Sequence, residues 1–138
     1  RRSTIAANSG GGLSVSGGTL DMTNSAVVGN GSGITVGRGI TLEDTSVTRF
    51  SFNTVVANIS SSANDDSLRC LGTVSGAVRN SIIVGQTPPT IEMACSALTF
   101  TGTVVDTASF VGANNLLESA LDLGWFTNPG ASDYHLST

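Results

Sequence analysis

The sequence predicts an all-β fold, a solenoid of about four to six short coils with a less regular C-terminal cap. Three observations predict it. A strand-sized phrase returns four times, short alternations of apolar and polar residues fill the sequence between its copies, and glycine, 17 of 138 residues, punctuates them. Self-similarity at a period of about 20–50 residues is typical of stacked repeats rather than of one globular sheet.

The repeated phrase joins Ser or Thr to small and β-branched residues and closes on Asn or Gln. Its copies occupy residues 3–8, 24–30, 53–58 and 80–86. With Ser or Thr as the mark, the copies start at residues 3, 25, 54 and 81, so the steps are 22, 29 and 27 residues. We expect each copy to form one strand and one corner of a coil.

The sequence between the copies predicts further short strands. Apolar and polar residues alternate with period 2 over three to five positions, which is typical of a half-buried strand. Glycines between these stretches supply the positive φ of sharp corners. The expected strands are 13–15, 19–22, 34–36, 40–42, 68–71, 75–78, 91–95 and 98–105. Three segments interrupt the pattern: an excursion or bulged strand at 43–52, a polar loop at 60–66, and a helical turn or loop at 114–121.

The chain is predicted to be a single domain over residues 1–138, with repeat coils at 1–106 and a terminal cap at 107–138. Solenoids need an atypical end to cover the last coil, and Trp125, Phe126 and Tyr134 are bulky enough to do so. Because the chain opens without methionine or a leader, we expect it to belong to a longer chain. End-to-end self-association would then satisfy an open first coil.

Charge and hydropathy exclude two classes of partner. The net charge is −4, and all six basic residues are arginines dispersed along the chain, so no nucleic-acid partner is expected. No apolar run approaches the roughly 18 residues that a membrane-spanning helix needs, so no membrane span is expected.

Cys70 and Cys95 lie 25 residues apart, close to one repeat. That spacing can bring them onto neighbouring coils within disulfide range, although two buried free thiols are the alternative. A disulfide would stabilise the fold by about 3–4 kcal/mol in the chain-entropy account and would imply an oxidising compartment. One histidine cannot complete a metal site with these cysteines, so no metal is expected.

The phrases resemble those of bacterial right-handed parallel β-helix proteins of the pectin-lyase-like superfold, in particular the C-terminal coils of large surface-anchored members. The resemblance rests on residues 80–86, Cys95, residues 114–116 and residues 133–136, and it spans nearly the whole chain. A Ser-Pro-Ala-Ile-Asp-like segment that usually follows in the family is missing, which favours a truncated chain. The resemblance implies an extracellular or cell-surface location, and a stacked ladder of Asn8, Asn30 and Asn58 that fades at Gln86.

Polysaccharide lyases of this fold use aspartates to hold calcium and an arginine or lysine to take a proton. Asp65 and Asp66 with Arg69 and Arg79 are the only local grouping of that kind. A solvated serine-rich loop explains the same residues without chemistry, and we favour that interpretation because no third acid stands nearby. No cofactor is therefore expected, and calcium enters only under the lyase alternative.

Trp125 and Tyr134 are candidates for stacking on sugar rings, with a core or capping role as the alternative. Taken together, the sequence favours a non-catalytic structural, adhesive or carbohydrate-contacting module. The partner would be a polysaccharide or cell-surface glycan. The alternative is a carbohydrate-active enzyme, a polysaccharide lyase or glycoside hydrolase of the same fold.

Overall fold

The computed structural model describes residues 2–31, 39–59, 64–85, 91–105, 114–117, 123–129 and 133–136. The side chains of 64–66, 91–94, 123 and 133–136 lie outside this description. The described chain is all-β with three parallel sheets, one antiparallel hairpin and a single short 3-10 turn, η2 (Leu123–Trp125). None of its helices is long and apolar enough to cross a membrane.

The three parallel sheets are named here A, B and C. Sheet A contains β1 (Thr4–Ala6), β4 (Ala26–Val28), β7 (Thr54–Val56), β10 (Ile82–Val84), β13 (Val104–Val105) and β14 (Leu116–Leu117). Sheet B contains β2 (Leu13–Ser16), β5 (Ile40–Glu43), β8 (Asn64–Leu71) and β11 (Ile91–Ala94). Sheet C contains β3 (Thr19–Thr23), β6 (Ser46–Ser51), β9 (Ser75–Arg79) and β12 (Thr99–Thr101).

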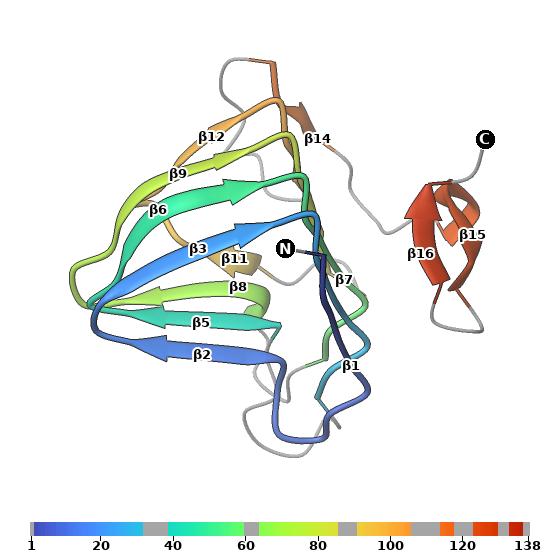
Figure 1. The fold of residues 1–138 in the computed structure, drawn as a ribbon, viewed down its shortest axis with the longest axis horizontal. Helices are drawn as coiled ribbons and strands as arrows, with labels where there is room; N and C mark the ends of the chain where they lie inside the picture. The colour runs from blue at the N-terminus through green and yellow to red at the C-terminus, as the bar shows by residue number, and fades with distance from the viewer. Residues whose placement is uncertain are drawn as a thin grey trace.

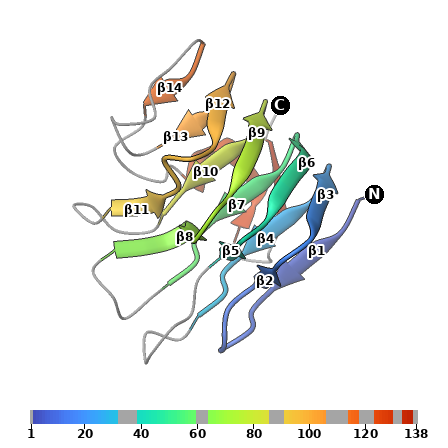
Figure 2. The same cartoon turned by 90° about the vertical axis from the view of Figure 1, so that its left-hand side faces the viewer.

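The chain visits the sheets in a fixed cycle, so each strand from β1 to β10 pairs in parallel with the strand three places later. Figure 1 shows the sheets as three sides of a triangle, with the chain passing from one side to the next. In Figure 2 the strands of sheet A follow one another in a row from the N-terminus to β14. This all-β, parallel arrangement is compatible with the predicted β-helix.

The register corrects the alignment of the repeated phrase by one residue. Thr4, Ala26, Thr54, Ile82 and Val104 are successive partners in sheet A, at steps of 22, 28, 28 and 22 residues. Asn53, not Thr54, therefore occupies the position of Ser25 and Ser81. The side chain at this position is an amide in Asn53 and a hydroxyl in Ser25 and Ser81.

The interior between the sheets is apolar. Alternate side chains of most strands point inward, and most of them are almost completely buried and stack from coil to coil. Fully buried members are Val27, Val55, Ile83 and Val105 of sheet A, Ile40, Leu42 and Leu68 of sheet B, and Phe50 and Val78 of sheet C. At about 25 cal/mol per Å² of apolar surface removed from water, this core is the main favourable contribution to folding.

Strand β6 is bulged, which confirms one of the two structures predicted for residues 43–52, an excursion or a bulged strand. Leu20 pairs with Val47 and Asp21 pairs with Arg49, so Thr48 is an extra residue relative to β3. The register against β9 shifts in the same stretch. Gly76 of β9 accommodates the bulge, because a Cβ there would overlap the carbonyl oxygen of Val47, and its φ is +123°.

Three other segments differ from the sequence prediction. Residues 64–66 belong to β8 rather than to a loop, because backbone pairing with β11 extends the strand. Residues 98–105 form two strands, since Gly102 turns the chain at a φ of +61°. Residues 116–117 form β14 rather than a helical turn or a loop. The strand predicted at 34–36 lies outside the described residues.

The tail returns to the outer side of sheet A. It forms an antiparallel hairpin of β15 (Phe126–Asn128) and β16 (Asp133–Leu136), which lies on the far side of sheet A from sheets B and C (Figure 1). Phe126, with Trp125 packed beside it, joins Val28, Val56 and Val84 in a second apolar cluster. These three valines are at most 1% exposed, so both faces of sheet A are covered here.

Candidate functional site

Asn8, Asn30 and Asn58 form a hydrogen-bonded ladder at the corner that follows sheet A. The Asn8 Nδ2 donates to Asn30 Oδ1 at 2.9 Å, and the Asn30 Nδ2 donates to Asn58 Oδ1 at 2.9 Å. Each of these carbonyl oxygens also accepts the backbone N–H of the preceding asparagine, at 3.1 Å. Asn30 and Asn58 are fully buried, so the ladder satisfies groups that water does not reach.

A second ladder precedes sheet A and was not expected from the sequence. The Ser25 N–H donates to Asn53 Oδ1 at 3.0 Å, and the Asn53 N–H donates to Ser81 Oγ at 3.1 Å. The pattern returns farther along, where the Thr103 N–H donates to Asn115 Oδ1 at 2.9 Å. In the sequence Asn53 directly precedes Thr54. An alignment of Ser and Thr residues alone therefore selects Thr54 and misses Asn53, which occupies the ladder position.

Cys70 and Cys95 form a disulfide, with their Cα atoms 4.8 Å apart. Cys70 ends the inward-facing row of β8, and Cys95 follows β11, the neighbouring strand of sheet B. The bridge therefore joins two successive coils directly. A disulfide of this kind is typical of oxidising compartments.

The residues proposed for lyase chemistry lie on strands of two sheets. Asp65, Asp66 and Arg69 lie in β8 of sheet B, whereas Arg79 ends β9 of sheet C. The side chains of Asp65 and Asp66 lie outside the description. Among the side chains that are described, no three His, Cys, Asp or Glu residues come close enough to hold a metal ion.

The two aromatic candidates belong to the tail hairpin. Trp125 packs against the second apolar cluster and meets Phe126 edge to face, with ring centroids 6.4 Å apart. It is only partly exposed, so much of its ring is engaged in packing. Tyr134 lies in β16, and its side chain is outside the description.

A groove of about 500 Å³ lies on the outer face of sheet C and is named here the sheet C groove. The bulge in β6 shapes it, because Thr48 and Arg49 both face solvent between the inward-facing Val47 and Phe50. Bulges commonly redirect side chains beside functional sites. The lining residues are Val47, Thr48, Arg49, Phe50, Ser51, Gly76, Ala77, Arg79 and Thr99.

Arg49 is held over the groove by an ion pair with Asp21 of the preceding coil. The Arg49 Nε donates to Asp21 Oδ1 at 3.0 Å, and Nη2 donates to Asp21 Oδ2 at 2.6 Å. The hydrogen bond and positive charge of Arg49 lower the pKa of Asp21, and the same bond raises the pKa of Arg49. Both side chains are more than half exposed, so the pair orients Arg49 more than it stabilises the fold.

Arg79 is the second cation of the groove. Its side chain is exposed, and no carboxylate in the described part of the chain pairs with it. Its backbone carbonyl accepts the N–H of Phe52, at 3.3 Å, which places Phe52 next to it at the corner leading into sheet A. Ser51 stands beside Arg79 in the register, and Thr99 adds a hydroxyl from β12.

Phe52 is exceptional for its position. Its side chain is 61% exposed and its φ is +58°, a left-handed conformation that is unfavourable for a bulky residue. The equivalent corner in the neighbouring coils holds Asn24 and Asn80, whose φ values are +50° and +48°. Neither burial nor backbone preference explains a phenylalanine here.

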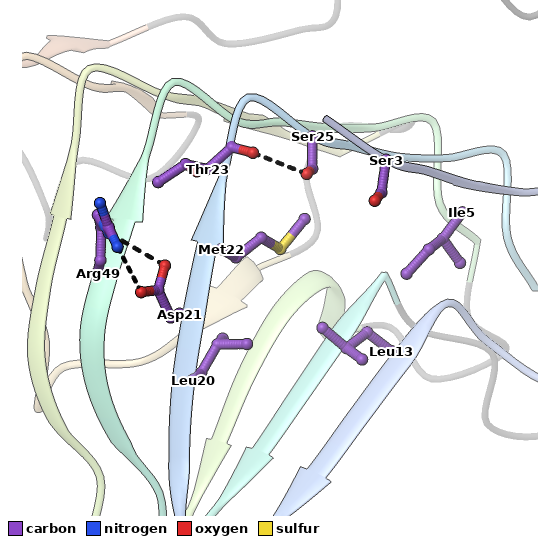
Figure 3. A pocket seen from close by; sticks show the side chains of 9 residues that line it. All are labelled: Ser3, Ile5, Leu13, Leu20, Asp21, Met22, Thr23, Ser25 and Arg49. Carbon is purple, nitrogen blue, oxygen red and sulfur yellow. Dashed lines mark hydrogen bonds and ion pairs between the residues drawn. The ribbon is translucent and has the colours of Figure 1, made fainter. Parts of the chain in front are cut away.

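The open end of the first coil holds a second cavity, of about 590 Å³. Figure 3 shows Ile5, Leu13, Leu20 and Met22 pointing toward one another at its centre, with the Asp21–Arg49 pair at one side. β1, β2 and β3 are the edge strands of their sheets at this end. The cavity therefore lies at the end of the apolar interior that these edge strands border.

No protein-family model, curated protein or solved structure matches this chain.

Proposed function

We propose that the chain is a right-handed parallel β-helix of the pectin-lyase-like type that acts outside the cell as a non-catalytic, carbohydrate-contacting module. The observation that carries the proposal is the sheet C groove, where guanidinium and hydroxyl groups line a hollow on a regular scaffold. Sugars present dense hydroxyl groups, which such donors and acceptors can bind. The hydrogen-bonded ladders and the disulfide support the role of a rigid extracellular scaffold.

Binding and turnover can be tested together. The purified chain would be run in native gels containing neutral or acidic polysaccharides, and each polysaccharide would also be assayed for new reducing ends and unsaturated sugars, with and without calcium. We expect retardation by at least one polysaccharide and no turnover. Turnover that disappears in Asp66→Ala would contradict the non-catalytic proposal and favour the lyase alternative.

The end of the molecule formed by β1, β2 and β3 supports an adhesive contribution through end-to-end association. Its edge strands and its apolar cavity present the same kind of surface that each coil offers to the next. Light scattering over a wide concentration range would measure this. A mass that stays at one chain throughout would remove self-association from the proposed function while leaving carbohydrate contact untouched.

A further inference from the structure

We propose that Asn30 and Asn58 accept N-linked oligosaccharide in the unfolded chain only, so that glycan transfer and folding exclude each other. The inference does not depend on the proposed carbohydrate contact. It follows from three observations: both asparagines begin acceptor motifs, their amide nitrogens are enclosed in the ladder, and the backbone of each motif is bound within the stack of coils.

The two acceptor motifs are Asn30-Gly31-Ser32 and Asn58-Ile59-Ser60. Both fit the pattern Asn-x-Ser or Asn-x-Thr, in which the middle residue is not proline. No other asparagine of the sequence is followed two residues later by Ser or Thr. Such a motif ordinarily marks a surface loop, because the attached group is bulky and polar. Here both asparagines are 0% exposed.

The side-chain nitrogen is the atom that transfer would change. A bond forms between Nδ2 and the anomeric carbon of the sugar, and the bond from that carbon to a polyprenyl pyrophosphate breaks. The pyrophosphate leaves and the amide loses one proton; the donor is the lipid-linked oligosaccharide of a secretory compartment. In the folded chain, Asn30 Nδ2 donates to the Ile5 carbonyl oxygen at 3.0 Å and to Asn58 Oδ1 at 2.9 Å. Both of its N–H groups are therefore engaged.

Two glycines close the space beside these nitrogens. A Cβ at Gly12 would lie 3.0 Å from Asn30 Nδ2, and a Cβ at Gly39 would lie 2.6 Å from Asn58 Nδ2. Not even a methyl group fits there without a shift of the surrounding atoms, and a sugar ring is far larger. The corner can hold the ladder or a glycan, and it has no room for both.

The backbone of the motifs is bound as well. The Gly31 N–H donates to the Asn8 carbonyl oxygen at 2.7 Å, and the Ile59 N–H donates to the Asn30 carbonyl oxygen at 2.7 Å. A transferase has to draw the acceptor motif into its own active site, so these bonds must open first. Access to either asparagine therefore requires unfolding of the corner.

A glycan added before folding would prevent the ladder from forming. Attachment of a sugar removes one of the two N–H groups of the amide, and Asn30 uses both. A buried acceptor without its donor costs more stability than the bond contributes. The Cys70–Cys95 disulfide requires an oxidising compartment. In such a compartment the fold arises only where the coils close before transfer, or where the transferase is missing.

The exclusion is tested by offering the same sequence in two states. The nascent chain is translated behind a cleavable signal peptide into microsomes, and the purified folded chain is incubated with transferase and lipid-linked donor from those microsomes. We expect mass spectrometry to find glycan on Asn30 and Asn58 of the nascent chain. Modification of the folded chain should be at least about 100-fold slower, because only its unfolded fraction reacts.

Gly10→Ser provides the matched control within the same ladder. It creates an acceptor motif at Asn8, which is exposed, and a side chain at Gly10 meets no other group. Asn8 of this variant should be modified in the nascent and in the folded chain alike. Failure of the folded variant to accept glycan at Asn8 would remove burial as the reason for the exclusion and overturn the proposal.

The effect on folding is tested with Ser32→Ala and Ser60→Ala combined, which removes both motifs and keeps both asparagines. In microsomes this double variant should form the Cys70–Cys95 disulfide and resist protease. The glycosylated parent should be cleaved at least about ten-fold faster. Equal resistance of the two would overturn the proposal. So would a nascent chain that carries no glycan on Asn30 or Asn58 while Gly10→Ser is modified at Asn8.

Discussion

At the scale of single residues, the Asp21–Arg49 pair is the contact in which charge is most clearly organised. A carboxylate that accepts two hydrogen bonds from a guanidinium is favoured in its ionised form. The folded-state pKa of Asp21 is lowered, so its contribution to stability is present above the unfolded pKa and is lost as pH falls through the folded pKa.

The first prediction therefore concerns the titration of Asp21. A carboxyl ¹³C NMR titration of the folded chain should place the pKa of Asp21 below the ordinary aspartate value, and Arg49→Gln should raise it toward that value. Arg69→Gln, which removes an arginine from β8 of sheet B, serves as the control. A pKa of Asp21 that does not respond to loss of Arg49 would show that the ion pair does not persist in solution.

The second prediction concerns the left-handed corner at Phe52. Asparagine tolerates positive φ better than phenylalanine, so Phe52→Asn should raise the free energy of unfolding by about 0.5–1 kcal/mol. Urea denaturation monitored by circular dichroism would measure it. Phe52→Ala keeps the strain and should show no such gain, so equal effects of the two variants would contradict the explanation.

At the scale of elements, each asparagine of the ladder contributes to the free energy of unfolding by an amount that depends on its position in the ladder. Asn58 Oδ1 accepts both the backbone and side-chain N–H groups of Asn30, and its Nδ2 donates to the Val27 carbonyl at 2.9 Å. All of this lies in the buried corner. Removing the amide would leave several buried polar groups without partners, which costs more than the bonds themselves contribute.

The third prediction follows: Asn58→Ala should lower the free energy of unfolding by about 2–5 kcal/mol. Asn8→Ala, at the exposed end of the same ladder, should cost about 1 kcal/mol or less. The two variants differ only in their place along the ladder, so similar losses in urea denaturation would refute a dependence on burial.

The strands were largely predictable from the sequence, and the groove was not. Leu13–Ser16 and Thr19–Thr23 alternate apolar and polar residues, and the structure alternates their burial accordingly. The Asp21–Arg49 pair could not be found this way, because its members are 28 residues apart and meet only through strand register and a one-residue bulge. Local periodicity does not contain that information.

A similar limit applies to sheet A, although here the sequence held a signal. Val27-Val28, Val55-Val56 and Ile83-Val84 are consecutive apolar pairs, which do not alternate, and adjacent strand residues face opposite sides. Such runs indicate a sheet covered on both faces. The covering segment itself could not be named, because residues 123–129 carry no feature that specifies which surface they contact.

At the scale of the whole molecule, the tail hairpin packs against several coils at once. Phe126 is 4% exposed and clusters with valines from β4, β7 and β10.

The fourth prediction is that Phe126→Ala lowers the free energy of unfolding by about 3–5 kcal/mol, or detaches the hairpin first. Hydrogen exchange by mass spectrometry distinguishes the two, since detachment raises exchange in 123–136 alone. Leu116→Ala, at a residue 54% exposed, is the control and should change little.

The position of this hairpin also bears on the order in which the chain folds. Coils of neighbouring sequence can form as they are synthesised, since each strand waits only for the one about a repeat later. Phe126 of the hairpin contacts valines that lie 42, 70 and 98 residues earlier, so its docking site exists only after the middle coils have assembled. Closure of so long a loop is slow. During that interval the apolar outer stripe of sheet A is bare, and aggregation competes with folding in proportion to its lifetime.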